Sequence, residues 1–352
     1  MAELPAMRES LLFYCMSRAI LQLLRPGSWF KNVFVLAPAF FAGELLDAAV
    51  PAKSLLAALA FCLLSSAVYC MNDIRDAEAD RRHPYKKLRP IASGQVSKGV
   101  AAVVAVLLLL LSLSLAAVIG RPALVWVLLA YLCINIMYSL WLKRKPLIDI
   151  SIVAIGFVLR IFAGSIAAGC TASAWIVMVT FLLSLFLVMG KRREDAAYAS
   201  GGIYTPRFID ASMVALGACT IVVYIIYTVL PSPSKTITSD YFYITAIPVT
   251  IGILRYMQIC LVDNRGGRHS AILFRDSVIL WCILIYIVIF VTLWLAGREV
   301  CSTSTALLSV VTVSSTSFTT FRAVSQWLLP CGCCRSCSGL HSPPSAWATK
   351  AS

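Results

Sequence analysis

The sequence predicts an all-α membrane protein, a polytopic bundle of about nine transmembrane helices. Its residues are 60% hydrophobic and 13% charged, whereas soluble domains carry about 25% charged residues. The apolar residues form runs close to the ~20 residues that a helix needs to cross ~30 Å of hydrocarbon. Lys and Arg collect in alternate connections between these runs. These three observations exclude an ordinary soluble globule.

The apolar runs define the predicted spans in order. The first, at 31–50, is the least regular, because Pro38, Gly43, Glu44 and Asp47 interrupt it, and a half-buried entry into the membrane is the alternative for it. The remaining spans are predicted at 54–72, 99–119, 123–142, 148–168, 174–190, 210–230, 240–261 and 276–296.

The basic residues predict the orientation of the bundle. On one side, the connections carry only Lys53, Arg121, Lys235 and Arg298. The positive-inside rule therefore places the N-terminus and the loops after the second, fourth, sixth and eighth spans in the cytoplasm, in a multi-pass protein of the cell membrane. This asymmetry explains most of the net charge of +14 without a nucleic-acid partner. Basic loops of this kind suit anionic lipid or a phosphorylated substrate.

The chain divides into three regions by composition. Residues 1–30 form a cytoplasmic N-terminal segment, in which 11–24 fit an amphipathic helix lying on the membrane, with Arg18 and Arg25 on its polar side. Residues 31–296 form the transmembrane domain. Residues 297–352 form a tail rich in Ser, Thr and Cys.

Cysteines in the tail raise the question of a metal site. Of the 13 cysteines, seven are scattered through apolar spans, where a thiol packs as a small hydrophobe. Four others lie close together with one histidine nearby, at spacings too compressed for a zinc site: Cys331, Cys333, Cys334, Cys337 and His341. Because no helical periodicity is evident after about residue 301, we predict a tail that is disordered or foreign to the fold, with a metal site as the alternative.

An acidic motif follows the second span. If the helix continues, Asn72 and Asp76 are four residues apart, and Asp73, Asp76 and Asp80 lie at i, i+3 and i+7 on one face. Carboxylates so close repel one another unless a cation lies between them. Hard oxygen ligands favour Mg²⁺, which proteins often share with substrate phosphates. The motif therefore predicts a magnesium site, and the Lys and Arg residues that follow it would hold the remaining phosphate charge.

A second unusual charge lies inside a predicted span. Arg160 is about twelve residues into 148–168, where a charged residue costs at least ~2.5 kcal/mol on insertion scales. Eleven residues of helix, about 16 Å, separate it from Asp149 and rule out a direct contact. We predict that Arg160 binds a substrate phosphate, together with Lys143 and Lys191 on neighbouring cytoplasmic ends. A structural partner on another helix is the alternative.

The motif of Asn72, Asp73, Asp76 and Asp80, with the Arg-Pro-Ile-Ala-Ser-Gly run at 89–94, resembles the UbiA-like superfamily of intramembrane transferases, over nearly all of residues 20–296. Within it, four segments resemble the branch called decaprenyl-phosphate phosphoribosyltransferase: 24–32, 138–143, 146–149 and 190–192. The resemblance implies a nine-helix bundle with a polar cavity open to the cytoplasm. It also implies transfer of 5-phosphoribose from phosphoribosyl diphosphate to a polyprenyl phosphate, for lipid-linked arabinose donors and cell-wall glycans.

The helical spacing, the placement of charge and this resemblance together give the candidate site residues their roles, with Asp73, Asp76 and Asp80 as the expected catalytic residues. Asn72 and Asp76 are expected to bind Mg²⁺ directly, with Asp73 and Asp80 acting through water or on ribose hydroxyls. The expected substrate contacts are Lys31, Tyr69, Lys87, Arg89, Lys143, Arg160, Lys191 and Arg192. Tyr69 also fits a plain interface tyrosine. We expect direct displacement at C1 of the donor without a strong general base, because a phosphomonoester is already largely ionised at neutral pH.

Two other functions stay open. An aromatic prenyltransferase of the same superfamily usually carries a second acidic motif after the sixth span, but here the sequence reads Lys-Arg-Arg-Glu-Asp at 191–195, and two adjacent acidic residues cannot share a helical face. A transporter typically has paired, interrupted helices at the membrane midplane rather than one acidic motif at the surface. The length of the isoprenoid acceptor and a homo-oligomeric state are also left open.

Overall fold

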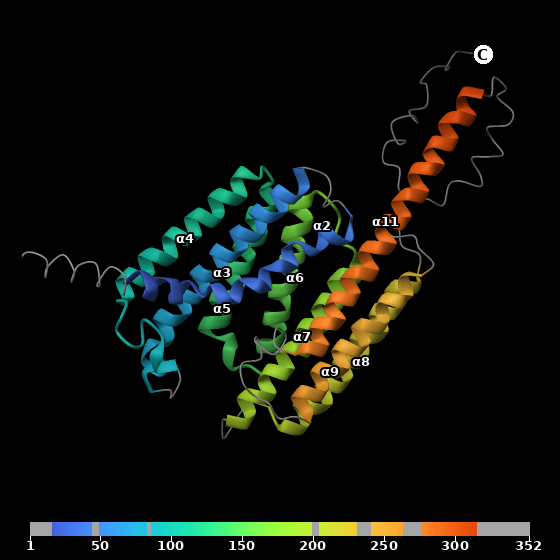
Figure 1. The fold of residues 1–352 in the computed structure, drawn as a ribbon. Coiled ribbons are helices and arrows are strands. Elements are labelled where there is room, and N and C mark those ends of the chain that lie inside the picture. Colours follow the sequence, from blue (N-terminus) through green and yellow to red (C-terminus); the bar gives the residue numbers. More distant parts are fainter. Residues whose placement is uncertain are drawn as a thin grey trace, which may run out of the picture.

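The computed structural model describes residues 16–43, 49–82, 86–198, 204–230, 241–262 and 276–314, and within these ranges it contains helices and no strand. The elements follow one another as η1 (Pro26–Val35), α2 (Ala37–Phe41), α3 (Ala49–Arg82), η3 (Lys86–Leu88), α4 (Lys98–Val118), α5 (Pro122–Leu140), η4 (Leu142–Arg144), α6 (Ile148–Ala168), α7 (Ala174–Tyr198), α8 (Pro206–Val229), η5 (Phe242–Thr245), α9 (Ala246–Leu261) and α11 (Ser277–Ser314) (Figure 1). The prediction of an all-α bundle is confirmed.

Eight helices in the described part of the chain are long and apolar enough to cross a membrane. They correspond to the second through ninth predicted spans, and each of them keeps its place in the order. In Figure 1, α3 and α4 lie on one side of the bundle, α8, α9 and α11 lie on the other, and α6 and α7 lie between them.

The first predicted span, 31–50, is wrong as a continuous helix. The chain forms the 3-10 helix η1, then the short helix α2, and a turn at Gly43 with a positive φ of 68°. Pro26 and Pro38 start these two pieces, because a proline fits the first turn of a helix but lacks the N–H that an interior position needs. The half-buried alternative agrees better with this broken segment, which packs against α3 and α6.

Specific contacts hold η1 against the bundle. Gly164 of α6 lets the backbone approach closely, since a Cβ there would collide with the carbonyl oxygen of Val35. On the other side, Trp29 Nε1 donates to Ser66 Oγ at 3.0 Å, and Ser66 Oγ donates to the Leu24 carbonyl oxygen at 2.7 Å. The segment preceding η1 is helical at residues 16–24 and buries Leu23 against α3 and α4. Part of the predicted N-terminal helix is thus confirmed as a helix.

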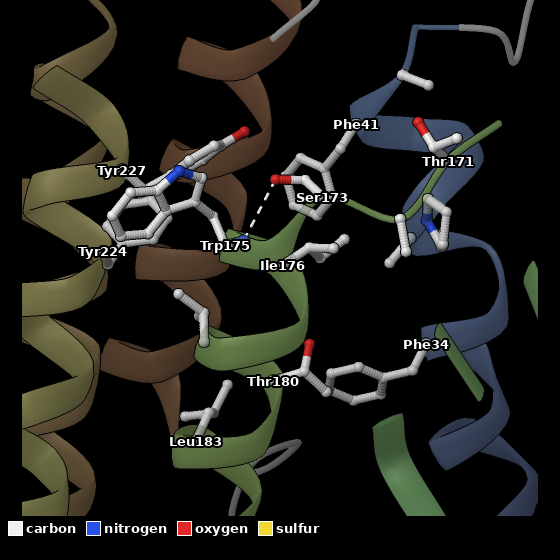
Figure 2. A pocket seen from close by; sticks show the side chains of 15 residues that line it. Phe34, Phe41, Thr171, Ser173, Trp175, Ile176, Thr180, Leu183, Tyr224 and Tyr227 are labelled. Carbon is white, nitrogen blue, oxygen red and sulfur yellow. Dashed lines mark hydrogen bonds between the residues drawn. The ribbon is translucent and has the colours of Figure 1, made fainter. Parts of the chain in front are cut away.

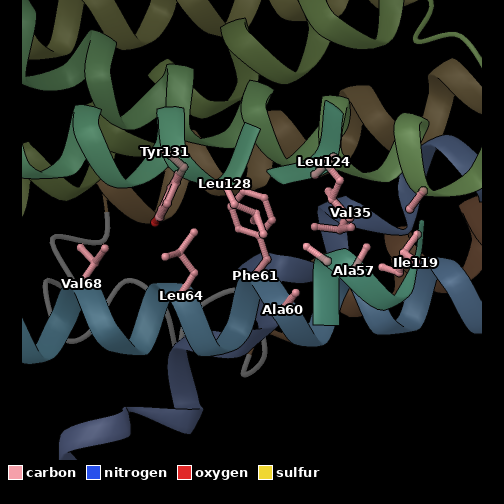
Figure 3. Packing of buried hydrophobic residues seen from close by; sticks show 13 residues of the cluster. Val35, Ala57, Ala60, Phe61, Leu64, Val68, Ile119, Leu124, Leu128 and Tyr131 are labelled. Carbon is pink, nitrogen blue, oxygen red and sulfur yellow. The ribbon is translucent and has the colours of Figure 1, made fainter. Parts of the chain in front are cut away.

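The interior between α3 and α5 is filled by large apolar side chains alternating with alanines. Phe61 and Leu64 of α3 point toward Leu128 and Tyr131 of α5 (Figure 3). Ala57 and Ala60, among the small residues of α3, permit close helix packing, as in membrane bundles generally. This packing fixes α3, which carries the acidic motif at its far end.

The helix α11 continues beyond the ninth predicted span. It reaches Ser314, so helical structure extends past Ala296 and through the first part of the predicted tail. Residues 315–352, which include the four clustered cysteines and His341, lie outside the described residues. The expectation that helical structure ends near residue 301 is wrong for 301–314, and the prediction for residues 315–352 stays a prediction.

Candidate active site

The acidic motif lies on the last turns of α3. This helix runs without interruption through 34 residues, from Ala49 to Arg82, so the expected continuation of the second span through the motif is confirmed. At about 100° per residue, Asp73 and Asp80 point within about 20° of each other, and Asn72 and Asp76 within about 40°. We call Asp73 and Asp80 the fixed edge of the motif, and Asn72 and Asp76 its open edge.

Arginines surround the fixed edge. Nη2 of Arg25 donates to both carboxylate oxygens of Asp73, at 2.6 and 2.8 Å, and Asp73 is only 3% exposed. Nη1 of Arg89 donates to Asp73 Oδ1 at 3.1 Å and to Asp80 Oδ2 at 2.6 Å. The guanidinium of Arg25 also lies 5.1 Å from the ring centre of Tyr69. The structure therefore brings Tyr69, Arg89 and the two carboxylates close together, and their roles toward substrate and metal stay predictions.

Arg25 was missed as a site residue. It lies 48 residues from Asp73 in sequence, and the sequence placed it on the polar side of a surface helix. Its backbone has a positive φ of 51°, which is uncommon for a residue with a side chain and lets the chain turn from the segment 16–24 into η1. The only sequence signal for it is its place in the segment 24–32, which resembles a known branch.

The open edge has a different environment. Lys143 Nζ of η4 donates to Asp76 Oδ2 at 2.9 Å, and the Asp76 side chain is 32% exposed. Asn72 lines a small cavity of about 110 Å³ between α3 and α5, together with Asn135 and Ser139. The motif is therefore not one column with one environment, because the two edges face different neighbours. Lys143 was predicted to share a phosphate pocket with Arg160. In the structure, it contacts the acidic motif instead.

The residues of the open edge suit Mg²⁺. In the described ranges, no group of three or more His, Cys, Asp and Glu side chains is placed to hold a metal by itself. Mg²⁺ does not require such a cage, because it is commonly bound by one or two carboxylates and by substrate phosphates. Asn72 and Asp76 offer hard oxygen atoms one helical turn apart, and Asp76 is accessible. Asp73 uses both oxygens for Arg25, which suits an indirect role.

Arg160 is enclosed by neutral partners. Its side chain donates to Asn32 Oδ1 at 2.8 Å, to the Gly156 carbonyl oxygen at 2.7 Å, to Tyr131 Oη at 3.1 Å and to Ser65 Oγ at 3.4 Å. Arg160 is 5% exposed, and its guanidinium lies about 5 Å from the ring centres of three aromatic residues, Phe61, Tyr131 and Phe157.

This network joins η1, α3, α5 and α6 around one cation, which matches the alternative of a partner on another helix. Ser65 lies on nearly the same stripe of α3 as the open edge, seven residues before Asn72, and hence about 10 Å deeper in the bundle. Lys31, half-buried on η1, directly precedes Asn32, which accepts from Arg160. The predicted phosphate contact of Arg160 stays a prediction.

A second charged cluster joins α6, α7 and the residues before α8. Asp149 is 1% exposed and accepts from Arg192 Nη2 at 2.6 Å and from Tyr204 Oη at 2.5 Å. Burial, followed by the hydrogen bond to Asp149, raises the pKa of the Tyr204 hydroxyl. The next arginine, Arg193, pairs with Asp210 of α8. Asp149 is thus the partner of Arg192 and not of Arg160.

Sequence reasoning missed Asp149 and Tyr204 as neighbours of a site residue. Their partners lie far along the chain, 43 residues from Asp149 to Arg192 and 55 from Asp149 to Tyr204. Lys87 and Lys191, two other predicted substrate contacts, are exposed. The side chains of Glu194 and Asp195 lie outside the described residues.

An apolar cavity of about 190 Å³ lies between α2, α7 and α8. Figure 2 shows side chains from α2 and α7 pointing toward it, with Phe34 and Trp175 on opposite sides. Residues of α7 line it from Trp175 to Leu183, and Arg192 lies nine residues beyond Leu183 on this helix, about 14 Å further along its axis. The sequence did not predict this cavity.

A family model and several related proteins match this chain. The model of the UbiA prenyltransferase family matches residues 33–274. A decaprenyl-phosphate phosphoribosyltransferase from Corynebacterium glutamicum is 34% identical over 274 residues, which cover 74% of this chain and 82% of that protein. One from Mycobacterium tuberculosis is 33% identical over 273 residues, 74% of this chain and 89% of that protein.

Solved structures of the same fold also match. A UbiA homolog from Archaeoglobus fulgidus bound to GPP and Mg²⁺ gives a TM-score of 0.60 at 20% identity, with 80% of this chain and 99% of that chain covered. A UbiA homolog from Aeropyrum pernix K1 gives a TM-score of 0.54 at 17% identity, covering 73% and 96%. At these identities, the likeness concerns the fold.

Proposed function

Since the chain belongs to the UbiA prenyltransferase family, we propose that it transfers 5-phosphoribose from phosphoribosyl diphosphate to a polyprenyl phosphate, with release of pyrophosphate. The observation that carries this proposal is the identity of about one third with decaprenyl-phosphate phosphoribosyltransferases, over most of both chains. The product would supply lipid-linked arabinose donors for cell-wall glycans.

The charges around the motif support a substrate pair rich in phosphate. Arg25, Arg89 and Lys143 contact the acidic motif directly, and Arg192 lies at the same end of the bundle. A phosphoribosyl donor has a diphosphate and a 5-phosphate, and its acceptor has a further phosphate. An aromatic prenyltransferase needs cations for only one diphosphate. The segment after the sixth span also begins with bases, where such an enzyme usually carries a second acidic motif.

For the metal, we propose that Asn72 and Asp76 hold Mg²⁺ together with the donor diphosphate. When bound there, Mg²⁺ would neutralise charge that develops on the departing pyrophosphate. Asp73 and Asp80 keep Arg25 and Arg89 in place beside it, by the hydrogen bonds described above. In this division, the open edge binds Mg²⁺ and the fixed edge holds the two arginines.

The chemical step is a displacement at C1 of the ribose. The bond from C1 to the pyrophosphate oxygen breaks, and an oxygen of the acceptor phosphate forms the new bond to C1. The acceptor is already ionised, so the protein holds the two reactants and stabilises negative charge rather than removing a proton. Tyr69 packs beside the ribose or the diphosphate, and Lys31 and Lys87 approach the phosphates from η1 and η3.

For Arg160, we propose that it acts on the substrate phosphate by positioning a neighbouring residue, Lys31. Its Nε–H group holds Asn32 and so orders Lys31, the preceding residue, which would make the direct contact. The positive charges of Arg160 and Lys31 together would attract phosphate on the side of Asn72 and Asp76 that faces the interior of the bundle. Lys191 and Arg192 would complete the phosphate-binding surface at the end of α7.

For orientation, we propose that the N-terminus and the motif face the cytoplasm, in the cell membrane. The uneven distribution of Lys and Arg between the two sides of the bundle supports this orientation. The acceptor's isoprenoid chain would then extend away from the motif, and the apolar cavity beside Trp175 and Ile176 offers it a lining.

A donor competition assay in membranes tests the reaction class. Membranes that contain the protein receive either radiolabelled phosphoribosyl diphosphate, or a labelled polyprenyl diphosphate with aromatic acids. We expect Mg²⁺-dependent transfer of label into lipid only from the first donor, and none from membranes with Asp76→Ala. Label joined to the aromatic acid would instead identify an aromatic prenyltransferase. Absence of pyrophosphate release by the purified protein, given both substrates, would favour a transporter.

A further inference from the structure

The hydroxyl of Tyr204 lies between a carboxylate and a backbone N–H group. It donates to Asp149 Oδ1 at 2.5 Å and accepts from the backbone N–H of Leu147 at 2.6 Å. The other oxygen of Asp149 accepts from Arg192 at 2.6 Å. The phenolic oxygen thus joins the residues before α8 to the start of α6, where the almost fully buried carboxylate of Asp149 in turn binds Arg192 near the end of α7.

The bond from Leu147 to Tyr204 restrains the connection between α5 and α6, which also carries Lys143. Leu147 ends the short connection between α5 and α6, and η4 in the same connection carries Lys143, which contacts Asp76. Leu147 also has a positive φ of 66°, a backbone conformation that costs free energy for a residue with a side chain and persists only where the surroundings impose it. The bond to Tyr204 is one such restraint.

From these contacts we propose that Tyr204 is a positioning residue for the donor phosphates, which sets the places of Lys143 and Arg192 relative to each other. This inference rests on the proposed function and deepens it. Tyr204 itself contacts neither the acidic motif nor, in our proposal, the substrate. It acts through Leu147 on the connection that carries Lys143, and through Asp149 on Arg192.

The chain offers a matched control for this idea. Arg193 and Asp210 form an ion pair between α7 and α8, one residue beyond Arg192. That pair joins α7 to α8, in the same neighbourhood, and the ion pair itself involves neither Leu147 nor Asp149. A general loosening around the end of α7 and the start of α8 would therefore follow from either change, whereas a specific effect on Lys143 and Arg192 would follow only from a change at Tyr204.

The experiment compares Tyr204→Phe with Asp210→Asn in the full-length protein in detergent. Tyr204→Phe deletes one oxygen and keeps the ring that stacks on Phe208. We expect it to raise the KM for phosphoribosyl diphosphate about fivefold, from the loss of the hydrogen bonds. The KM for the lipid acceptor should change less than twofold, and the inhibition constant of pyrophosphate should rise in parallel with the donor KM. Asp210→Asn should leave all three values near those of the parent.

A second variant keeps the test decisive if Tyr204→Phe folds poorly. Asp149→Asn retains a side chain of the same shape but weakens the hold on Arg192, and it should raise the same donor KM. Adding Tyr204→Phe to Arg192→Lys should give less than the product of the single effects. Equal donor KM values for Tyr204→Phe and Asp210→Asn, or fully multiplicative effects in the double variant, would overturn the proposal. A parent protein that transfers no phosphoribose would instead overturn the proposed function.

Discussion

The two edges of the acidic motif carry residues of nearly the same chemistry, yet they have opposite surroundings. At the fixed edge, Asp73 is buried and has both oxygens engaged by arginines. At the open edge, Asp76 is about one third exposed and meets a single flexible lysine. The difference shows that the surroundings of a carboxylate in such a motif depend on the helix face it occupies. In our proposal, one edge of the motif orders cations and the other presents oxygens to a metal.

The largest effect is expected at the open edge. Asp76→Ala should reduce turnover by at least about 100-fold, as is typical when a group that stabilises transition-state charge is removed. The bundle should stay folded, because Asp76 is accessible and only Lys143 loses a partner. Initial rates at saturating Mg²⁺ and a thermal melt of the same sample measure both quantities. If the variant keeps half of the parent rate, the open edge does not hold the metal.

The fixed edge should respond in stability as well as in activity. Asp73→Asn removes the charge between Arg25 and Arg89, and we expect a loss of about 1–3 kcal/mol in the free energy of unfolding, as for a buried group whose partner is deleted. The unfolding midpoint in detergent should fall, unlike that of Asp76→Ala. Equal midpoints for the two variants would show that the two edges do not differ in the way the contacts suggest.

The proposed action of Arg160 on substrate phosphate is tested by the variant Arg160→Lys. A lysine keeps the charge but cannot reproduce the four hydrogen bonds of the guanidinium. We expect the apparent KM for a phosphate-bearing substrate to rise about tenfold, equivalent to ~1.4 kcal/mol. Arg160→Met, which also removes the charge, should lose more activity. Unchanged kinetics in Arg160→Lys, with a destabilised Arg160→Met, would make Arg160 a structural partner of other helices and nothing more.

The smallest effect is expected far from both edges. A chain ended after Ser314 keeps all eight apolar helices and both edges of the motif. It should fold and turn over substrate within about twofold of the full chain, since surface changes away from specific contacts usually cost less than ~0.5 kcal/mol. Expression level and initial rate are the measurements. A truncated protein that fails to accumulate would give the tail a structural role.

The sequence predicted the elements of the fold well because each span is a local pattern. Runs of apolar residues, read against the thickness of a bilayer, located eight helices. The continuation of the second predicted span, 54–72, into the motif was a separate, conditional expectation, and α3 meets it. The broken segment at 31–50 was the exception. Its two prolines and Gly43 were visible, but whether such a segment spans the membrane or packs back on the bundle depends on close neighbours such as Gly164 in a distant helix.

The sequence predicted the residues of the acidic motif, but it did not predict which side chains they contact. Helical spacing correctly put four polar residues on one side of α3, and the arc of about 100° from Asn72 to Asp73 is wide enough for that side to meet two sets of neighbours. Arg25 and Tyr204 reach the site by tertiary contacts alone, so no local pattern marks them. Asp149 was noted within the segment 146–149 and as a residue that Arg160 could not reach, but its pairing with Arg192 was not predicted.

The unbroken course of α3 divides the site into a rigid part and adjustable parts. All four motif side chains are carried by the same helix that is packed against α5 by Phe61 and Leu64, and no hinge separates the two. The carboxylates cannot close on a substrate without moving the whole bundle. Any closure must come from the opposing pieces, namely η1, the segment with Arg89 and the connection with Lys143. The acidic motif therefore keeps a fixed place in the bundle, and the spacing between its carboxylates and the cations is set by the backbone segments that bear the cations.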